Sequence, residues 1–89
     1  MARAIAEVEY NGSAAAHARR FAREILTEWR LDAITVEAEI VATELVTNAV
    51  LHGAPPISVE LTYDADRLRI GVFDCSAAPP VPGRPGPDA

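Results

Sequence analysis

The stretch VEAEIVATELVTNAVLHG, residues 36–53, decides the fold. Its apolar residues recur at the spacing of one face of a 3.6-residue helix, which predicts a long helix with a buried stripe. The stripe consists of Ala38, Val41, Ala42, Leu45 and Ala49, and Val46 and Val50 widen it. So much apolar surface predicts that protein covers most of the last three turns. We expect the helix to end at Gly53, which can adopt the left-handed conformation that closes many helices.

Polar side chains interrupt this apolar pattern near the end of the helix. Glu44 and Asn48 are four residues apart, so they project together from one edge of the stripe, with Thr47 beside them. On the rim of a buried helix, a carboxylate and a carboxamide lose hydration free energy unless polar partners form hydrogen bonds with them. This mismatch makes the pair a candidate functional site.

The residues upstream predict an edge strand and a second helix. Residues 3–10 alternate weakly between apolar and polar, which favours a short strand at the edge of a sheet. Asn11-Gly12 breaks this run, and an amphipathic helix is expected over residues 13–30. Its predicted buried stripe comprises Ala18, Phe21, Ala22, Ile25, Leu26 and Trp29.

The residues downstream predict a β-hairpin. Residues 57–63 alternate cleanly, a turn follows at 64–66, and a return strand is expected over 67–74. The inward residues are Ile57, Val59, Leu61 and Tyr63 on the first strand, and Leu68, Ile70 and Val72 on the second. Asp74 has the parity of this second set, so its carboxylate should point toward the helices. The predicted fold class is α/β of the α+β kind, a two-layer sandwich with helices on one face of a mostly antiparallel sheet.

Length and composition limit the classes of protein to consider. The 89 residues support one domain, and a net charge of −5 with scattered basic residues argues against binding to nucleic acid or an anionic membrane. A single cysteine, Cys75, excludes an internal disulfide, and without a basic neighbour it is expected to be a small apolar residue. The N-terminus lacks an apolar signal segment and no stretch is long enough to span a bilayer, so we expect a cytoplasmic location.

The residues after Cys75 differ in composition from the rest of the chain. Five of the seven prolines and two of the five glycines lie there, which excludes a helix or a central strand. We therefore divide the chain into a folded domain, residues 1–76, and a Pro/Gly-rich segment without regular structure, residues 77–89.

The polar residues at the two element ends allow two interpretations. In the functional one, Asp74 accepts a hydrogen bond from an exocyclic amine, Asn48 holds a hard cation and Glu44 positions or deprotonates a nucleophile. In the other, Asp74 caps the following turn and Glu44 is an ordinary rim residue. The pattern of residues alone leaves both open.

Two motifs carry a resemblance to a known family. Glu44-Leu45-Val46-Thr47-Asn48-Ala49, followed by His52-Gly53, resembles the N-box of the histidine-kinase-like ATPases, which share the Bergerat fold. Val72-Phe73-Asp74-Cys75-Ser76, with Pro79 and Pro80 beyond, resembles their G1 box in the branch where Asp-x-Ser replaces Asp-x-Gly-x-Gly. That branch contains the small anti-sigma-factor serine/threonine kinases and related ATP-binding regulators. The resemblance runs along essentially the whole chain, including an Ala/Arg-rich first helix with a late Trp29.

The resemblance implies roles for individual residues in a partial Bergerat fold. Glu44 would be the general base or water-orienting carboxylate, and Asn48 would ligate Mg²⁺ bridging the ATP phosphates. Asp74 would read the adenine amino group, with Ser76 or a nearby water helping. His52 would either hydrogen-bond near the phosphates or interact with the helix dipole. Residues 77–89 would be the ATP lid or a linker.

The resemblance also implies a function and partners. The first hypothesis is an ATP-binding regulator of transcription that phosphorylates a serine or threonine of an antagonist protein, sequesters a sigma factor and forms a homodimer. The alternative is a non-catalytic protein-interaction module with weak or no nucleotide binding. An unrelated helix–hairpin domain would be supported if Glu44, Asn48 and Asp74 proved far apart.

The sequence departs from the family pattern at its C-terminus. The family continues into a Gly-rich G2 box, whose backbone amides cradle the phosphates, and none appears before Ala89. We therefore expect either a fragment of a longer protein or a truncated product with impaired nucleotide binding. Whether the 89 residues alone form an enzyme stays open.

Overall fold

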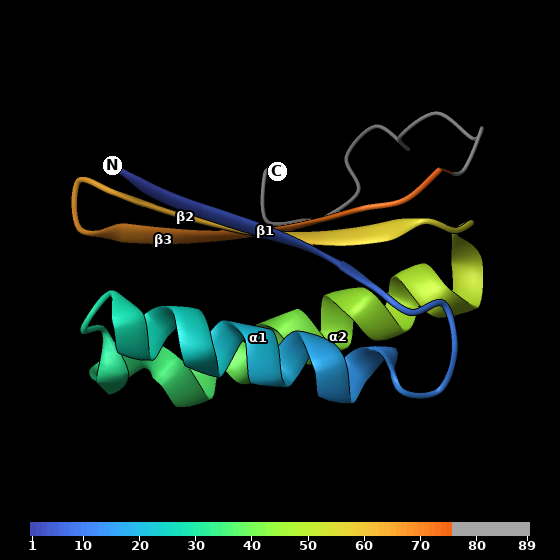
Figure 1. Ribbon diagram of the computed structural model, residues 1–89, viewed down its shortest axis with the longest axis horizontal. Helices are drawn as coiled ribbons and strands as arrows, with labels where there is room; N and C mark the ends of the chain where they lie inside the picture. Colours follow the sequence, from blue (N-terminus) through green and yellow to red (C-terminus); the bar gives the residue numbers. More distant parts are fainter. Residues whose placement is uncertain (76–89) are drawn as a thin grey trace.

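The computed structural model describes residues 1–75. The elements follow in the order β1 (Ala2–Val8), α1 (Ala14–Glu28), a single 3₁₀ turn η1 (Asp32–Ile34), α2 (Thr35–His52), β2 (Ile57–Asp64) and β3 (Arg67–Phe73). Figure 1 shows the two helices lying side by side in one layer against one face of the sheet. The predicted α+β two-layer sandwich is confirmed. The predicted division of the chain at residue 76 lies outside the described residues.

The sheet is antiparallel, in the order β1-β2-β3. β1 pairs with β2 from Ala2 opposite Tyr63 to Val8 opposite Ile57, and β2 pairs with β3 through a tight hairpin. The hairpin turn contains Ala65 and Asp66 with φ angles of 52° and 62°, the left-handed pair of a type I′ turn. Within residues 1–75, β1 has a strand neighbour on one side alone, so its predicted position at an edge is confirmed.

The core lies between the sheet and the helices. β2 is the central strand and contributes its inward side chains, while each helix contributes one narrow stripe made mostly of alanines. Small side chains let the helices approach the sheet and each other closely. The buried residues are Val8, Ala14, Ala18, Ala22, Leu26, Ala38, Ala42, Val46, Ala49, Ile57, Val59, Leu61 and Ile70.

The outer flank of α2 is more exposed than its sequence predicts. Val36 is 70% exposed, Ile40 53%, Val41 41% and Leu51 68%, so the expected burial of Val41 and of most of the last three turns is wrong for the described residues. The cause is the position of α2 in the layer. It packs against α1 on one side and against β2 and β3 below, and no described element lies against its other side.

An ion pair and a backbone motif fix the two helices. Arg23 of α1 donates two hydrogen bonds to the Glu39 carboxylate of α2, at 3.2 and 3.0 Å. At the end of α1, Leu31 N–H donates to Leu26 O at 2.8 Å and Arg30 N–H to Thr27 O at 3.1 Å, which is the Schellman arrangement. Neither helix is long and apolar enough to cross a bilayer, a finding that concerns residues 1–75.

Candidate functional site

The C-terminal end of α2 and the end of β3 lie at the same end of the molecule (Figure 1). The backbone joins them directly, because the Cys75 N–H donates a hydrogen bond of 2.9 Å to the Ala54 carbonyl. Both resemblance motifs therefore meet here, one at the end of the helix and the other at the end of the strand.

The Asp74 carboxylate lies against Gly53, the residue that ends α2. A Cβ atom placed on Gly53 would be 2.5 Å from Asp74 Oδ2 and 2.7 Å from the Ala49 carbonyl oxygen. The predicted inward direction of Asp74 is therefore confirmed. Gly53 has φ −102° and ψ −160°, an extended conformation, so the predicted left-handed cap is wrong. Glycine is required here because a side chain would have no space.

Tyr10 adds a third segment to this end of the fold. Its hydroxyl donates a hydrogen bond of 2.8 Å to the Gly53 carbonyl oxygen. Tyr10 shares the alternation of Ala4, Ala6 and Val8, and the sequence pattern assigned it no role. The alternation along the strand could have predicted this contact. A side chain on the inner face, just beyond the end of the strand, points toward the end of the helix layer.

Glu44 and Asn48 lie on a solvent-exposed ridge of α2. The ridge follows the i, i+4 spacing, and its members are Val36, Ile40, Glu44, Asn48 and His52, all exposed. Glu44 and Asn48 therefore keep their hydration, contrary to the prediction, and the described residues include no buried polar side chain. What the spacing did predict correctly is that the two side chains share one edge of the helix.

Helix geometry relates the ridge to Asp74. At 1.5 Å per residue, Asn48 lies roughly 7 Å along the axis from Gly53, and Glu44 lies one turn further, roughly 14 Å away. The fold thus brings Asn48 and Asp74 to one end of α2 and sets Glu44 about 6 Å behind Asn48. Ser76, the fourth predicted site residue, lies outside the described residues.

The donor atoms at the end of α2 suit a hard cation that receives most of its ligands from a bound substrate. Among residues 1–75, no three His, Cys, Asp or Glu side chains come close enough to hold a metal ion by themselves. The Asn48 carboxamide oxygen is a hard donor, and Mg²⁺ is commonly bound by one or two such protein groups together with phosphates of its substrate. Nucleotide-bound Mg²⁺ therefore fits these residues, whereas a site made of protein ligands alone does not.

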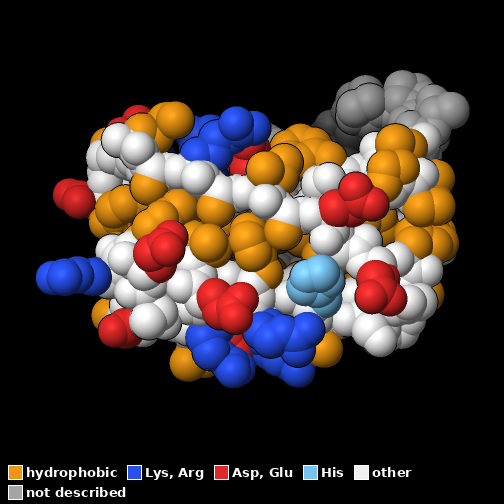
Figure 2. All heavy atoms as spheres, in the orientation of Figure 1, with side chains coloured by type: hydrophobic (Ala, Val, Ile, Leu, Met, Phe, Trp, Pro, Cys, Tyr) orange, Lys and Arg blue, Asp and Glu red, His pale blue; other side chains and the backbone are white. Residues whose placement is uncertain are grey.

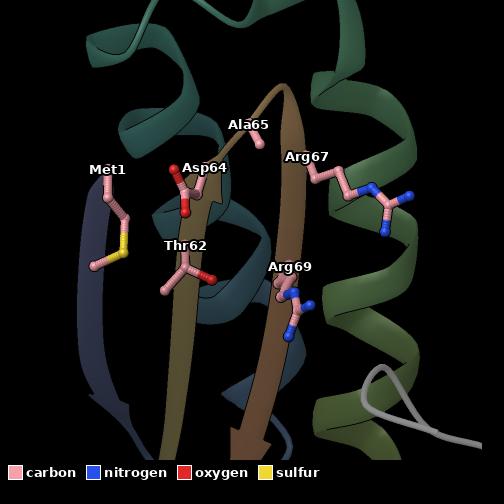
Figure 3. Close-up of a pocket in the computed structure, with 6 residues that line it drawn as sticks. All are labelled: Met1, Thr62, Asp64, Ala65, Arg67 and Arg69. Carbon is pink, nitrogen blue, oxygen red and sulfur yellow. The ribbon is translucent and has the colours of Figure 1, made fainter.

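A separate hollow of about 320 Å³ lies on the other end of the sheet (Figure 3). Its lining residues are Met1, Thr62, Asp64, Ala65, Arg67 and Arg69. Arg67 begins β3 and Asp74 follows its end, so the strand separates the hollow from Asp74 by roughly 20 Å. The hollow is not part of the site at the end of α2.

Comparison with known proteins gives one family. The sequence model of the histidine kinase-like ATPase domain matches residues 8–89. No curated protein and no solved structure matches the chain.

Proposed function

This chain belongs to the histidine kinase-like ATPase domain family, and from that membership we propose that it binds ATP with Mg²⁺ as a regulatory domain. The observation that carries the proposal is the Asp74 carboxylate held against Gly53, at the end of the helix that bears Glu44 and Asn48. Asp74 is exposed, so a ligand can reach its carboxylate, which is a suitable acceptor for the exocyclic amine of adenine.

The remaining roles follow the order of the residues along α2. Asn48, which lies closer to the end of α2 than Glu44 does, would hold Mg²⁺ near the phosphates. Ser76 would help at the adenine amine. When bound, Mg²⁺ neutralises charge on the phosphates. His52, at the end of the ridge, is exposed. It would either hydrogen-bond near the phosphates or interact with the dipole at the helix terminus.

The finer proposal is phosphoryl transfer to a protein. Glu44 would accept the proton of a serine or threonine hydroxyl as that oxygen bonds to the γ-phosphorus and the bond to the ADP oxygen breaks. The exposure of Glu44 supports this role, because a protein substrate has to reach the base from outside. The acceptor would be an antagonist protein of an anti-sigma system in the cytoplasm, and a sigma factor would be the second partner.

A non-catalytic interaction module is the alternative function. The exposed apolar residues of α2, Val36, Ile40 and Leu51, favour it, because an apolar helix flank is suited to contact with another protein. In that case nucleotide binding would be weak or absent, and the same helix would act through its surface.

The test is calorimetric titration of the folded 89-residue chain with ATP, with and without Mg²⁺. Binding that depends on Mg²⁺ is expected. Asp74→Asn should weaken it at least tenfold, because a carboxamide is a weaker acceptor than a carboxylate. Asn48→Ala should remove the effect of Mg²⁺. Glu37→Gln, a charge-removing change in the first turn of α2, is the matched control and should bind normally.

Turnover separates the two functions. Glu44→Gln should keep nucleotide affinity and abolish transfer of phosphate from ATP to the antagonist protein. A folded chain that binds no ATP with Mg²⁺ would reject the ATP-binding proposal and support the interaction module. If Asp74→Asn and the unaltered chain bound ATP with equal affinity, Asp74 would not be part of the nucleotide site.

A further inference from the structure

The hollow at the hairpin end of the sheet is lined by two exposed arginines, Arg67 and Arg69. They alternate with Leu68 and Ile70 along β3, so both leave its outer face, away from the helices. Within residues 1–75 neither arginine side chain forms a hydrogen bond or an ion pair. Two guanidinium groups on a concave surface are therefore available to bind an anion.

The strand register places a hydroxyl group beside these arginines. Thr62 of β2 lies directly opposite Arg69, and on its other side it lies opposite Arg3 of β1. The Cβ atoms of directly opposite residues are about 5 Å apart. Arg3 is engaged with Glu60, so its charge is matched within the sheet. The Thr62 hydroxyl can therefore donate a hydrogen bond to the same anion that the guanidinium group of Arg69 holds.

One acidic residue of the hollow, Asp64, opposes the binding of an anion. Asp64 lies opposite Arg67 in the register and lines the hollow with it. Figure 3 shows the Asp64 carboxylate directed toward the β1 side of the hollow, away from both arginines. The lining side chains thus carry two positive charges and one negative charge. The balance favours an anion, and removal of the Asp64 charge should strengthen its binding.

The positive charge over the sheet is separate from the basic residues of α1. Figure 2 shows basic side chains over the outer face of the sheet, at the top, and over α1, at the bottom, with a hydrophobic band between them. The chain as a whole has a net charge of −5, so it does not attract anions over a long range. An anion in the hollow would owe its affinity to local hydrogen bonds and local charge.

The chemistry of the donors favours a phosphate group over a carboxylate. A phosphate monoester has three terminal oxygens and nearly two negative charges at neutral pH, whereas a carboxylate has two oxygens and one charge. Arginine binds phosphate oxygens through paired N–H groups of its planar fork. The volume of about 320 Å³ is at the lower limit of ligand pockets, so it suits a phosphate group with a small substituent.

We propose that the hollow at the hairpin end of the sheet binds a phosphate group, held by Arg67, Arg69 and the Thr62 hydroxyl. The ligand is inorganic phosphate or a small phosphate monoester, which share this chemistry. Exposed side chains change rotamer within nanoseconds, so both guanidinium groups can turn toward one ligand. The hollow and Asp74 lie at opposite ends of β3, so this site does not depend on the proposed nucleotide site.

The test is an NMR titration of the isotopically labelled 89-residue chain with inorganic phosphate, at constant pH and ionic strength. The amides of Thr62, Arg67 and Arg69 should shift together, with a dissociation constant on the order of 1 mM. Arg69→Gln should raise that constant about fivefold, because a charge-assisted donor is lost. Thr62→Val, which removes the hydroxyl without a change of charge, should raise it about twofold. Asp64→Asn should lower it about twofold.

Arg20→Gln is the matched control, because it removes the same charge from an exposed position on α1. It should bind phosphate as the unaltered chain does, and circular dichroism shows that each variant is folded. Acetate at the same ionic strength should cause smaller shifts. A titration with O-phosphoserine distinguishes the two sources of the group. Tighter binding than inorganic phosphate identifies a phosphate monoester, weaker binding identifies the free ion, and either order supports the site.

Three results would overturn the proposal. One is the absence of shifts around the hollow in a folded chain, at phosphate concentrations well above the expected dissociation constant. Another is binding that Arg69→Gln and Arg20→Gln weaken equally, which would indicate general attraction by charge. The third is an equal response to acetate, which would mean that the hollow does not recognise a phosphate group.

Discussion

The position of Asp74 depends on a single neighbouring residue. Gly53 has no side chain, so the carboxylate can lie against the end of α2. The backbone of Gly53 is extended, a conformation open to every residue, so its need for glycine is a matter of space. A substitution at this residue therefore affects both packing and the candidate site.

Gly53→Ala should destabilise the fold and weaken ATP binding. The new Cβ would meet Asp74 Oδ2 at 2.5 Å and the Ala49 carbonyl oxygen at 2.7 Å. The carboxylate can move away, but the helix backbone yields less easily. We expect the free energy of unfolding to fall by about 1–3 kcal/mol. This exceeds the gain of about 0.4–1 kcal/mol from a less flexible unfolded chain. Urea unfolding and titration with ATP measure the two effects.

Gly12→Ala is the matched control for that substitution. A Cβ on Gly12 has no heavy atom within 4 Å, so the same added methyl group should cause no clash. Its stability should stay unchanged or rise slightly, and its affinity for ATP should be normal. Equal stability of the two variants would contradict the close approach of Asp74 to Gly53.

The helices owe their arrangement to contacts at their ends and along their shared side. α1 ends in a Schellman motif in which Arg30 occupies the left-handed position with φ 61°. Glycine is the residue that this position usually carries. The connection from α1 to α2 thus contains a local strain that a substitution can remove.

Arg30→Gly should stabilise the protein. A non-glycine residue in the left-handed region costs about 1–2 kcal/mol, and part of the gain is lost because glycine makes the unfolded chain more flexible. We expect a net rise of about 0.5–1 kcal/mol in the free energy of unfolding, measured by urea unfolding. The control is Arg20→Gly, an exposed position inside α1, which should lower it by about 1 kcal/mol. A loss of stability in Arg30→Gly would contradict the motif.

The ion pair between α1 and α2 should make stability depend on pH. The hydrogen bond from Arg23 lowers the pKa of the Glu39 carboxyl below its ordinary value, although desolvation opposes the change. A carboxyl with a lowered pKa binds its proton less readily in the folded state, so the pair stabilises the fold above the ordinary pKa. This contribution is lost as the pH falls through the lowered pKa.

Comparing the unaltered chain with Glu39→Gln tests this dependence. At neutral pH the variant should have the lower melting temperature, by a small amount because the pair is near the surface. The difference should disappear in acid, once Glu39 is protonated in both states. Glu37→Gln, in the first turn of the same helix, should show no such convergence. A difference that persists at low pH would mean that the substitution acts through packing.

The whole molecule is most stable at the centre of its sheet. β2 pairs with a strand on each side, and Ile57, Val59 and Leu61 on its inner face are fully buried. Amides of β2 should therefore exchange with solvent more slowly than those of β1 or β3 at low protein concentration. Slower exchange in either neighbouring strand would contradict this order.

Hydrogen exchange also tests the proposed nucleotide site. ATP with Mg²⁺ should slow exchange at the end of α2 and around Asp74, and leave the hairpin turn between β2 and β3 unchanged. Equal protection at both places would contradict a site at the end of α2.

The elements, their order and the inner face of the hairpin follow from the sequence alone. Apolar spacing at 3.6 and at 2 residues depends on neighbours a few positions away, so it can be read without knowing the fold. Both helices, the hairpin, its turn and the inward direction of Asp74 were predicted in this way. The N-box wording around Glu44 and Asn48 was a further local signal, and the family match agrees with it.

Tertiary structure alone decided how exposed the site is and which contacts support it. The exposure of Val41 and of the Glu44–Asn48 ridge follows from the place of α2 in the layer, which its own periodicity does not encode. The Tyr10 hydrogen bond to Gly53 and the Arg23–Glu39 pair join residues distant along the chain. The requirement for glycine at position 53 arises because Asp74, which follows the end of β3, approaches the end of α2. Such contacts depend on how separate elements pack in space, and no pattern within one element records that.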